Sequence, residues 1–172
     1  MNTEEMLRLK SMHIAPYMQL ATALIGKVRE GGGNMFRHQI DTMAILLDYG
    51  YIDSVLLKAS VVHDVLEDIP DFDRSQLLSI DAESPEVYKL VLEVSRRPEE
   101  TKPEFLLRVR KQGSRNAKIL KVADRISNMI SLGFVTSFEF ISRYADETVQ
   151  YVYPIAEEVD LKMLKELKSL VT

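Results

Sequence analysis

The string HDVLED, residues 63–68, places one imidazole and three carboxylates close together in the chain. His63 and Glu67 are four residues apart, as are Asp64 and Asp68. On a continuous helix running to about Asp68, all four side chains would therefore share one broad face. Carboxylates packed this closely repel one another and gain from a cation, and imidazole nitrogen with carboxylate oxygen suits manganese, iron, zinc or cobalt better than calcium. The alternative is a solvated acidic helix end, the more common role of such a cluster.

Two further residues, distant in sequence, have side chains suited to the same chemistry. His38 lies in the string FRHQ, just after three consecutive glycines and at an expected helix start. Asp124 follows two apolar residues in the strongly apolar segment 116–132. A buried carboxylate needs a partner, because an unpaired buried charge costs several kcal/mol or is neutralised. The structural interpretation of Asp124 is an ion pair with Arg125 or another arginine; Asn128 lies one helical turn further on.

The order of these residues resembles the signature of the HD superfamily of phosphohydrolases. A histidine is followed about 25 residues later by His-Asp, and about 60 residues after that by a helical aspartate. The resemblance implies that His38, His63, Asp64 and Asp124 hold one divalent cation, which we expect to be manganese. The third histidine of the chain, His13, is left over, and we interpret it as structural or as a surface residue.

The resemblance extends to the hydrolase domains of RelA/SpoT proteins and to the small alarmone hydrolases. HDVLED matches their HDxxED string, and KVADRISNMISL, residues 121–132, is similar to their KLADRLxNMRxL segment. The segments 87–100 and 142–159 match in position, so the similarity covers roughly residues 20–160. The family's Arg-Lys-Ser/Asp-Gly-x-Pro-Tyr run is altered, because Arg29 is retained but Glu30 replaces the lysine and Asn34-Met35 replaces Pro-Tyr. In the family, that loop belongs to the nucleotide site.

This resemblance implies hydrolysis of guanosine 3′-diphosphate 5′-di- or triphosphate, with release of pyrophosphate from the 3′ position. The metal would polarise a phosphoryl oxygen and lower the pKa of a water molecule. Glu67 would be the general base by the family pattern, with Asp68 as the other candidate. The chain is too short to hold a synthetase domain as well, so we expect hydrolysis only. The residues we expect to contact substrate are Arg29, Lys121, Arg125, Asn128 and Tyr144.

Two other functions fit the same residues. Another HD enzyme, such as a nucleotidase or a nucleoside triphosphate hydrolase, would share the metal ligands and differ in the altered loop at residues 29–37. A non-catalytic metal- or nucleotide-binding module would keep the fold alone. The intact HDVLED string argues against such a module, because a module without catalysis has no physical need for Glu67 and Asp68 beside a metal.

The elements expected to position these residues are all helical. Apolar residues recur at helical spacing almost everywhere, and we find no convincing strand or internal repeat. The sequence therefore predicts an all-α bundle in which residues 1–172 form one domain. The expected helices are 36–47, one capped by Asp53 or Ser54 that continues to about Asp68, one capped by Ser84, 105–112, 116–132, one capped by Thr136 that continues to about residue 153, and a last helical region starting or bending at Pro154.

Composition limits the environment and the partners of the chain. The formal net charge is −4 without a block of Lys or Arg, which disfavours a nucleic-acid partner and still allows a small anionic nucleotide in a local cleft. No apolar run approaches the ~20 residues needed to span a bilayer. The absence of cysteine and of an evident signal peptide fits the cytoplasm. The oligomeric state is left open.

Overall fold

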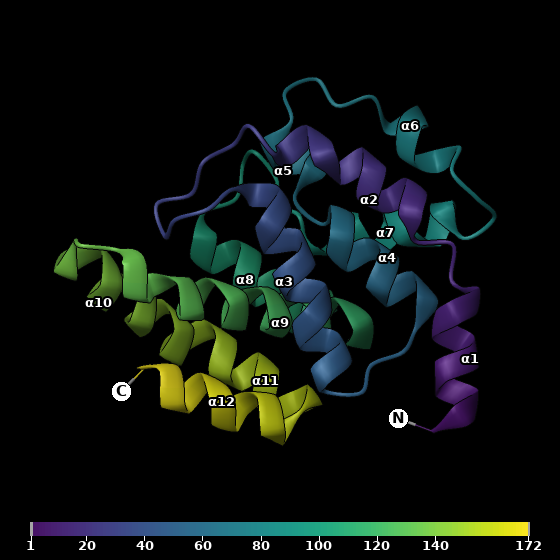
Figure 1. Cartoon of the computed structure of the whole chain (residues 1–172). Coiled ribbons are helices and arrows are strands. Elements are labelled where there is room, and N and C mark those ends of the chain that lie inside the picture. Colours follow the sequence, from purple (N-terminus) through teal and green to yellow (C-terminus); the bar gives the residue numbers. More distant parts are fainter. Residues whose placement is uncertain (1, 172) are drawn as a thin grey trace.

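Helix α9 (Arg115–Ser131) runs through the middle of the molecule in the computed structural model, which describes residues 2–171 (Figure 1). It packs against α3, α4, α7, α8, α11 and α12. Ser114 caps its start by accepting a hydrogen bond from the Ala117 backbone N–H at 3.2 Å. Because neighbours cover α9 on several sides, even its polar residues Lys121, Asp124 and Arg125 are buried.

The described chain is all-α, as the sequence predicted. Within residues 2–171 the only β pairing is an isolated bridge between Val28 and Asn34. No helix of this part of the chain has the length and apolar character to cross a membrane. The other helices are α1 (Thr3–Ser11), α2 (Ala15–Ala21), η1 (Thr22–Leu24), α3 (Met35–Asp48), α4 (Ser54–Val62), α5 (Val65–Asp68), α6 (Arg74–Leu78), α7 (Ser84–Val94), α8 (Lys102–Gln112), η2 (Leu132–Phe134), α10 (Phe138–Glu147), η3 (Thr148–Val152), α11 (Tyr153–Val159) and α12 (Leu161–Val171).

Helices α3 and α4 are joined by a tight connection that brings both against α9. Asn34 caps α3 by accepting from Arg37 N, and Asp53 caps α4 by accepting from Leu56 N. Between the two helices, Gly50 has a φ of +79°, a left-handed conformation that suits glycine at a helix C-terminus. The sequence predicted the roles of Gly50 and Asp53, and the Asn34 cap fixes the start of the helix that carries His38.

Three expected helix boundaries are wrong. Glu83, not Ser84, occupies the N-cap of α7. Helix α8 begins at Lys102 behind a capping box of Thr101 and Glu104, so Pro103 belongs to its first turn and not to a loop. The cap of α10 is Ser137, which accepts from Phe140 N, because Thr136 lies one residue too early to reach that amide.

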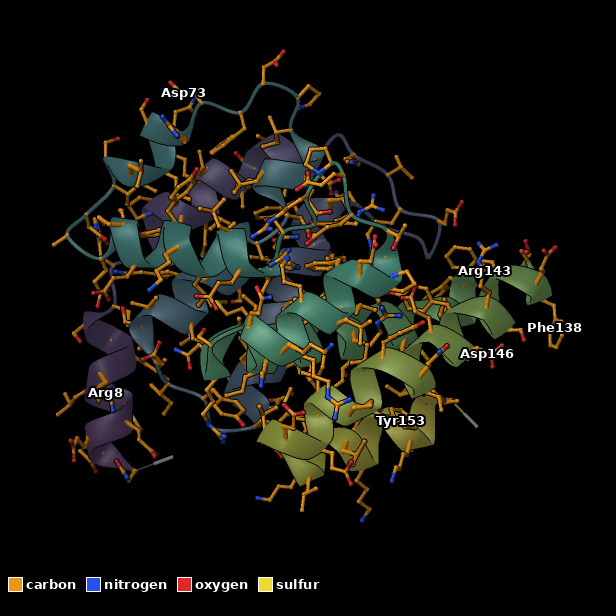
Figure 2. The ribbon with its side chains drawn as sticks, turned by 180° about the vertical axis from the view of Figure 1, so that it is seen from behind. Arg8, Asp73, Phe138, Arg143, Asp146 and Tyr153 are labelled. Carbon is orange, nitrogen blue, oxygen red and sulfur yellow. The ribbon has the colours of Figure 1, made fainter. Side chains whose placement is uncertain are left out.

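Helix α10 lies at the edge of the molecule and buries none of its side chains completely. Figure 2 shows Phe138 and Arg143 on this helix away from the body of the structure, and Phe138 is 82% exposed. The continuous helix expected to residue 153 is interrupted, since the chain forms the π-helical turn η3 and then α11, with Pro154 in its first turn. Only the inner face of α10 therefore faces the rest of the protein.

Candidate metal centre

Four side chains from three parts of the chain converge on one point. His38 comes from α3, Asp124 from α9, and His63 and Asp64 from the junction of α4 and α5. His38 Nε2 lies 3.0 Å from Asp124 Oδ1 and 3.6 Å from Asp64 Oδ2, whereas His63 Nε2 lies 3.7 Å and 3.2 Å from the same two oxygens. The donor atoms of the two histidines and Asp124 all lie within 4.8 Å of one another. This is a nitrogen and oxygen donor set of the size that one cation requires.

The expected continuous helix through HDVLED is wrong, because the chain leaves regular α-helix at His63 and Asp64, between α4 and α5. Helix α4 ends at Val62, and Asp64 (φ −99°, ψ −1°) precedes the short helix α5. Gln39 stabilises the break, because its side chain donates to Asp64 Oδ2 at 2.7 Å and accepts from Asp64 N at 3.4 Å.

Both imidazole rings are held through their Nδ1 atoms. His63 Nδ1 lies 2.7 Å from the Ser60 carbonyl oxygen, which can only accept, so in the neutral ring the proton is on Nδ1 and Nε2 carries a lone pair. His38 Nδ1 lies 2.9 Å from Ser127 Oγ. His63 Nε2 is buried and has no hydrogen-bond partner among the described residues. A lone pair facing two carboxylates is satisfied by a proton or by a metal ion. The hydrogen bonds at the two Nδ1 atoms are typical of histidines that bind a metal through Nε2.

The ion-pair partner of Asp124 is Lys121, not Arg125 as the structural interpretation expected. Lys121 Nζ donates to Asp124 Oδ2 at 2.5 Å. Arg125 lies one residue further along α9 and therefore points elsewhere. Its guanidinium donates to Glu147 Oε1 at 2.5 Å and to Thr148 Oγ1 at 3.1 Å, and it stacks on the ring of Tyr144 at 4.1 Å. Arg125 thus fixes the junction of α10 and η3.

The electric field of the cluster favours a positive charge at its centre. Burial raises the pKa of Asp124, but Lys121 and the two histidines outweigh burial and hold that pKa well below its usual range. Burial lowers the pKa of His63, and the carboxylates of Asp64 and Asp124 more than compensate, raising it to about 9. The carboxylates therefore stay ionised, and a divalent cation among them can supply the charge that a proton on His63 otherwise provides.

Glu67 and Asp68 differ in their contacts. Oε1 of Glu67 accepts a hydrogen bond from the Arg96 backbone N–H at 2.9 Å, and the residue keeps contact with solvent. Partial desolvation raises the pKa of Glu67, although the Arg96 amide and Lys121 oppose this effect. Asp68 instead forms an ion pair with Lys27. Glu67 therefore has no ion-pair partner among the described residues, whereas the carboxylate of Asp68 is paired with Lys27.

The amide of Asn128 orients Asp124. Its Nδ2 donates to the Asp124 carbonyl oxygen at 2.9 Å and to Oδ1 at 2.5 Å, while its Oδ1 accepts from Arg29 Nη2 at 2.6 Å. Arg29 also donates to Ser131 Oγ at 3.2 Å. The expectation that both residues contact substrate stays a prediction. In the structure they form a chain of hydrogen bonds from the loop around Gly31 to the centre.

A cavity of about 230 Å³ adjoins Asn128. Its walls come from the loop before α3, the end of α9 and the inner face of α10, and the rings of Phe140 and Tyr144 stack there with centroids 5.8 Å apart. The walls are mainly apolar and aromatic, with Arg29 as the cation. A larger cavity of 780 Å³ lies between α2 and the segment that follows α5, and it contains none of the expected site residues. Size alone therefore does not identify the functional site.

Two supporting residues were missed in the sequence. Gln39 is fully buried one position after His38, and Ser127 is buried three positions after Asp124. The spacing of Ser127 was a readable signal, because residues three apart on a helix share a face. The role of Gln39 depends on α5 lying beside α3, which no local pattern predicts.

Comparison with known proteins establishes the fold. No family model matches the sequence, and no curated protein matches it either. Among solved structures, a metazoan ortholog of SpoT, described as hydrolysing ppGpp and playing a role in starvation responses, matches with a TM-score of 0.76 at 23% identity. The match covers 91% of this chain and 92% of that chain. The shared all-α arrangement agrees with the fold expected from the sequence.

Proposed function

We propose that this chain, over residues 1–172, is an HD-type metal-dependent phosphohydrolase. Its substrates would be alarmones of the guanosine 3′,5′-bis(diphosphate) type, from which it would release pyrophosphate at the 3′ position. The observation that carries the proposal is the cluster of His38, His63, Asp64 and Asp124, in which Glu67 follows Asp64 by three residues. The fold shared with a ppGpp hydrolase supports the choice of substrate.

The four clustered residues fit a divalent metal ion. The unpartnered lone pair of His63 Nε2 and the ionised carboxylates are the features that a cation satisfies. When bound, such an ion supplies Lewis acidity to a phosphoryl oxygen and lowers the pKa of a water molecule. Two imidazoles with carboxylates and no thiolate suit manganese, which we propose as the native metal.

Glu67 acts as the general base in this proposal. A water oxygen attacks the phosphorus bonded to the 3′ oxygen, the bond between that oxygen and phosphorus breaks, and the water proton passes to a carboxylate oxygen of Glu67. Pyrophosphate leaves, and the 3′ oxygen takes up a proton, so a nucleoside 5′-di- or triphosphate remains. The Arg96 amide holds Oε1 of Glu67, and partial desolvation raises the pKa of this carboxyl group, which is the direction that favours a general base. Asp68 is the weaker candidate because Lys27 is its partner.

The nucleoside would occupy the cavity next to Asn128. Aromatic and apolar walls favour a purine base, and the Arg29 guanidinium can stack on it or pair with an oxygen. Tyr144 belongs to this wall, and Lys121 is the cation closest to the centre. We propose supporting roles for Arg125, which holds Tyr144, and for Asn128, which holds Asp124. The substrate is thus a small nucleotide.

One observation favours a second candidate, an HD nucleotide hydrolase of different specificity. Glu30 lies on the wall of the nucleoside cavity, where the alarmone hydrolases carry a lysine, and its negative charge changes what that wall attracts. Incubating the manganese-loaded protein with guanosine tetraphosphate, GTP, dGTP and nucleoside 5′-monophosphates separates the two candidates. Pyrophosphate from guanosine tetraphosphate alone supports the first, and turnover of another nucleotide supports the second. We further propose that the protein acts in the cytoplasm, which cell fractionation tests.

A further inference from the structure

Two ammonium groups lie against the buried ring of Phe105. Lys121 Nζ is 5.0 Å from the ring centroid, and Lys102 Nζ is 5.8 Å from it. Lys121 is neutralised by Asp124, whereas no carboxylate of the described residues is an ion-pair partner of Lys102. The chain therefore leaves one positive charge uncompensated beside the candidate metal centre.

The start of α8 holds Lys102 in this position. Arg108 donates to both carboxylate oxygens of Glu100, at 2.6 Å and 3.0 Å, and to the carbonyl oxygens of Glu93 and Ser95 at 3.0 Å and 2.8 Å. The capping box of Thr101 and Glu104 fixes the next turn. The backbone that carries Lys102 is thus tied down on both sides while its ammonium stays without a counter-charge, as expected of a preorganised anion site.

The charges around Lys102 also favour an anion. Burial, followed by the charges of Lys121 and Arg125, lowers the pKa of Lys102 to about 8, and Asp124 and Glu147 only partly offset this. A lowered pKa means that the folded protein tolerates the positive charge less well than the unfolded chain does. A bound anion would remove this penalty.

We propose that Lys102, together with Lys121, binds the terminal phosphoryl group of a diphosphate ester whose first phosphoryl group lies at the metal centre. Lys121 contacts Asp124 of the centre, and Lys102 lies next to Lys121 across the ring of Phe105, so the two cations extend outward from the point of reaction. A monophosphate ester has no second phosphoryl group to bind to these two lysines. The inference rests on the proposed function and assigns to this subsite the selection of diphosphate over monophosphate esters.

Binding of inorganic pyrophosphate and inorganic phosphate, measured by calorimetry on the manganese-loaded protein, tests this subsite without turnover. We expect Lys102→Met to weaken pyrophosphate binding by about ten- to hundredfold, the usual range for a lost charge-assisted hydrogen bond, and phosphate binding by less than about threefold. Lys102→Arg should recover most of the affinity. Lys111→Met, an exposed lysine of the same helix, is the matched control and should bind both anions normally.

Thermal unfolding separates a binding role from a structural one. Because the charge of Lys102 is disfavoured in the folded state, Lys102→Met should unfold at the same or a higher temperature than the parent protein. The subsite is refuted if Lys102→Met binds pyrophosphate normally, if it loses both anions equally, or if it unfolds at a clearly lower temperature. Failure of the proposed function gives a result distinct from failure of the subsite. In that case the parent protein would bind pyrophosphate through Lys102 and still leave guanosine tetraphosphate intact.

Discussion

The backbone amide of Arg96 donates a 2.9 Å hydrogen bond to Oε1 of Glu67. Arg96 lies in the loop after α7, so a segment distant in sequence fixes the position of the carboxylate that follows the α4–α5 break. The neighbouring carboxylate, Asp68, is turned instead to Lys27 in the loop before α3. The contacts of these two acids therefore differ, and the difference agrees with the choice of Glu67 over Asp68 as the expected general base.

Replacing Glu67 with Gln should lower kcat by about 10²–10⁴, the usual effect of losing a general base. The amide keeps the shape and the contact with Arg96 but cannot accept the proton. Metal content and KM should stay near those of the parent protein. Asp68→Asn is the matched control and should retain most of the activity. The opposite behaviour of the two variants would move the general base to Asp68.

His63→Ala or Asp64→Ala should lose the metal and the activity together. Each removes one of four donors, and the remaining three do not complete a site for a tightly held ion. Metal content per chain after dialysis, measured by elemental analysis, gives the result directly. His13→Ala is the control, because His13 is exposed and lies near Asp81, outside the cluster. Retention of a full equivalent of metal by either ligand variant would remove that residue from the ligand set.

Gly31→Ala should weaken substrate binding without affecting the metal. A Cβ on Gly31 would lie 2.9 Å from Ser131 Cβ and 3.1 Å from its carbonyl oxygen, so the loop must move away from α9. The hydrogen bonds of Arg29 to Ser131 and Asn128 would then lengthen, and we expect KM to rise by roughly tenfold. Gly26→Ala, whose Cβ meets nothing within 4 Å, is the control. Equal kinetics in the two variants would mean that this loop does not contact substrate.

Lys58→Met should destabilise the protein by about 3 kcal/mol at neutral pH, because it leaves carboxylates at a partly buried site without their cation. Lys58 is 3% exposed and donates to Asp81 at 2.8 Å and to Glu83 at 2.5 Å. Urea denaturation measures the loss, with Lys111→Met as the exposed control.

The stability of Lys58→Met should also depend on pH differently from the stability of the parent protein. Burial raises the pKa of Asp81, but hydrogen bonds from Lys58 and Tyr17 outweigh burial, so the net pKa of Asp81 is lowered. The hydrogen bond from Lys58 also lowers the pKa of Glu83. Both pKa values are therefore lower in the folded state. The stability that these two carboxylates contribute to the folded protein is present above pH about 4 and is lost as the pH falls through their folded pKa values. The stability difference between parent and Lys58→Met should thus shrink from about pH 5 to pH 3, and a constant difference would contradict this assignment.

The sequence predicted elements whose signals are local. The apolar period located α9 to within one residue at each end, and Asp53 and Gly50 marked the ends of neighbouring helices as expected. The order of His38, the HDVLED string and Asp124 predicted one cluster, and in the structure these residues lie close together although they come from separate helices. These results reflect burial patterns and backbone preferences, which neighbouring residues determine.

What the sequence missed depends on tertiary contacts. The break at Asp64 is stabilised by Gln39 on another helix, so the local pattern favoured an unbroken helix. Lys102 approaches Lys121 only because α8 packs on α9. The pairing of Lys121 with Asp124 was predictable, because residues three apart share a helical face and adjacent residues such as Arg125 do not.

The most direct measurement is the release of pyrophosphate from guanosine tetraphosphate by the manganese-loaded protein, with GDP quantified in the same reaction. We predict equimolar pyrophosphate and GDP, loss of the reaction on chelation, and its return when manganese is restored. His63→Ala should give neither product at any manganese concentration that supports the parent protein. Intact guanosine tetraphosphate with a protein that holds a full equivalent of metal would contradict the proposed function.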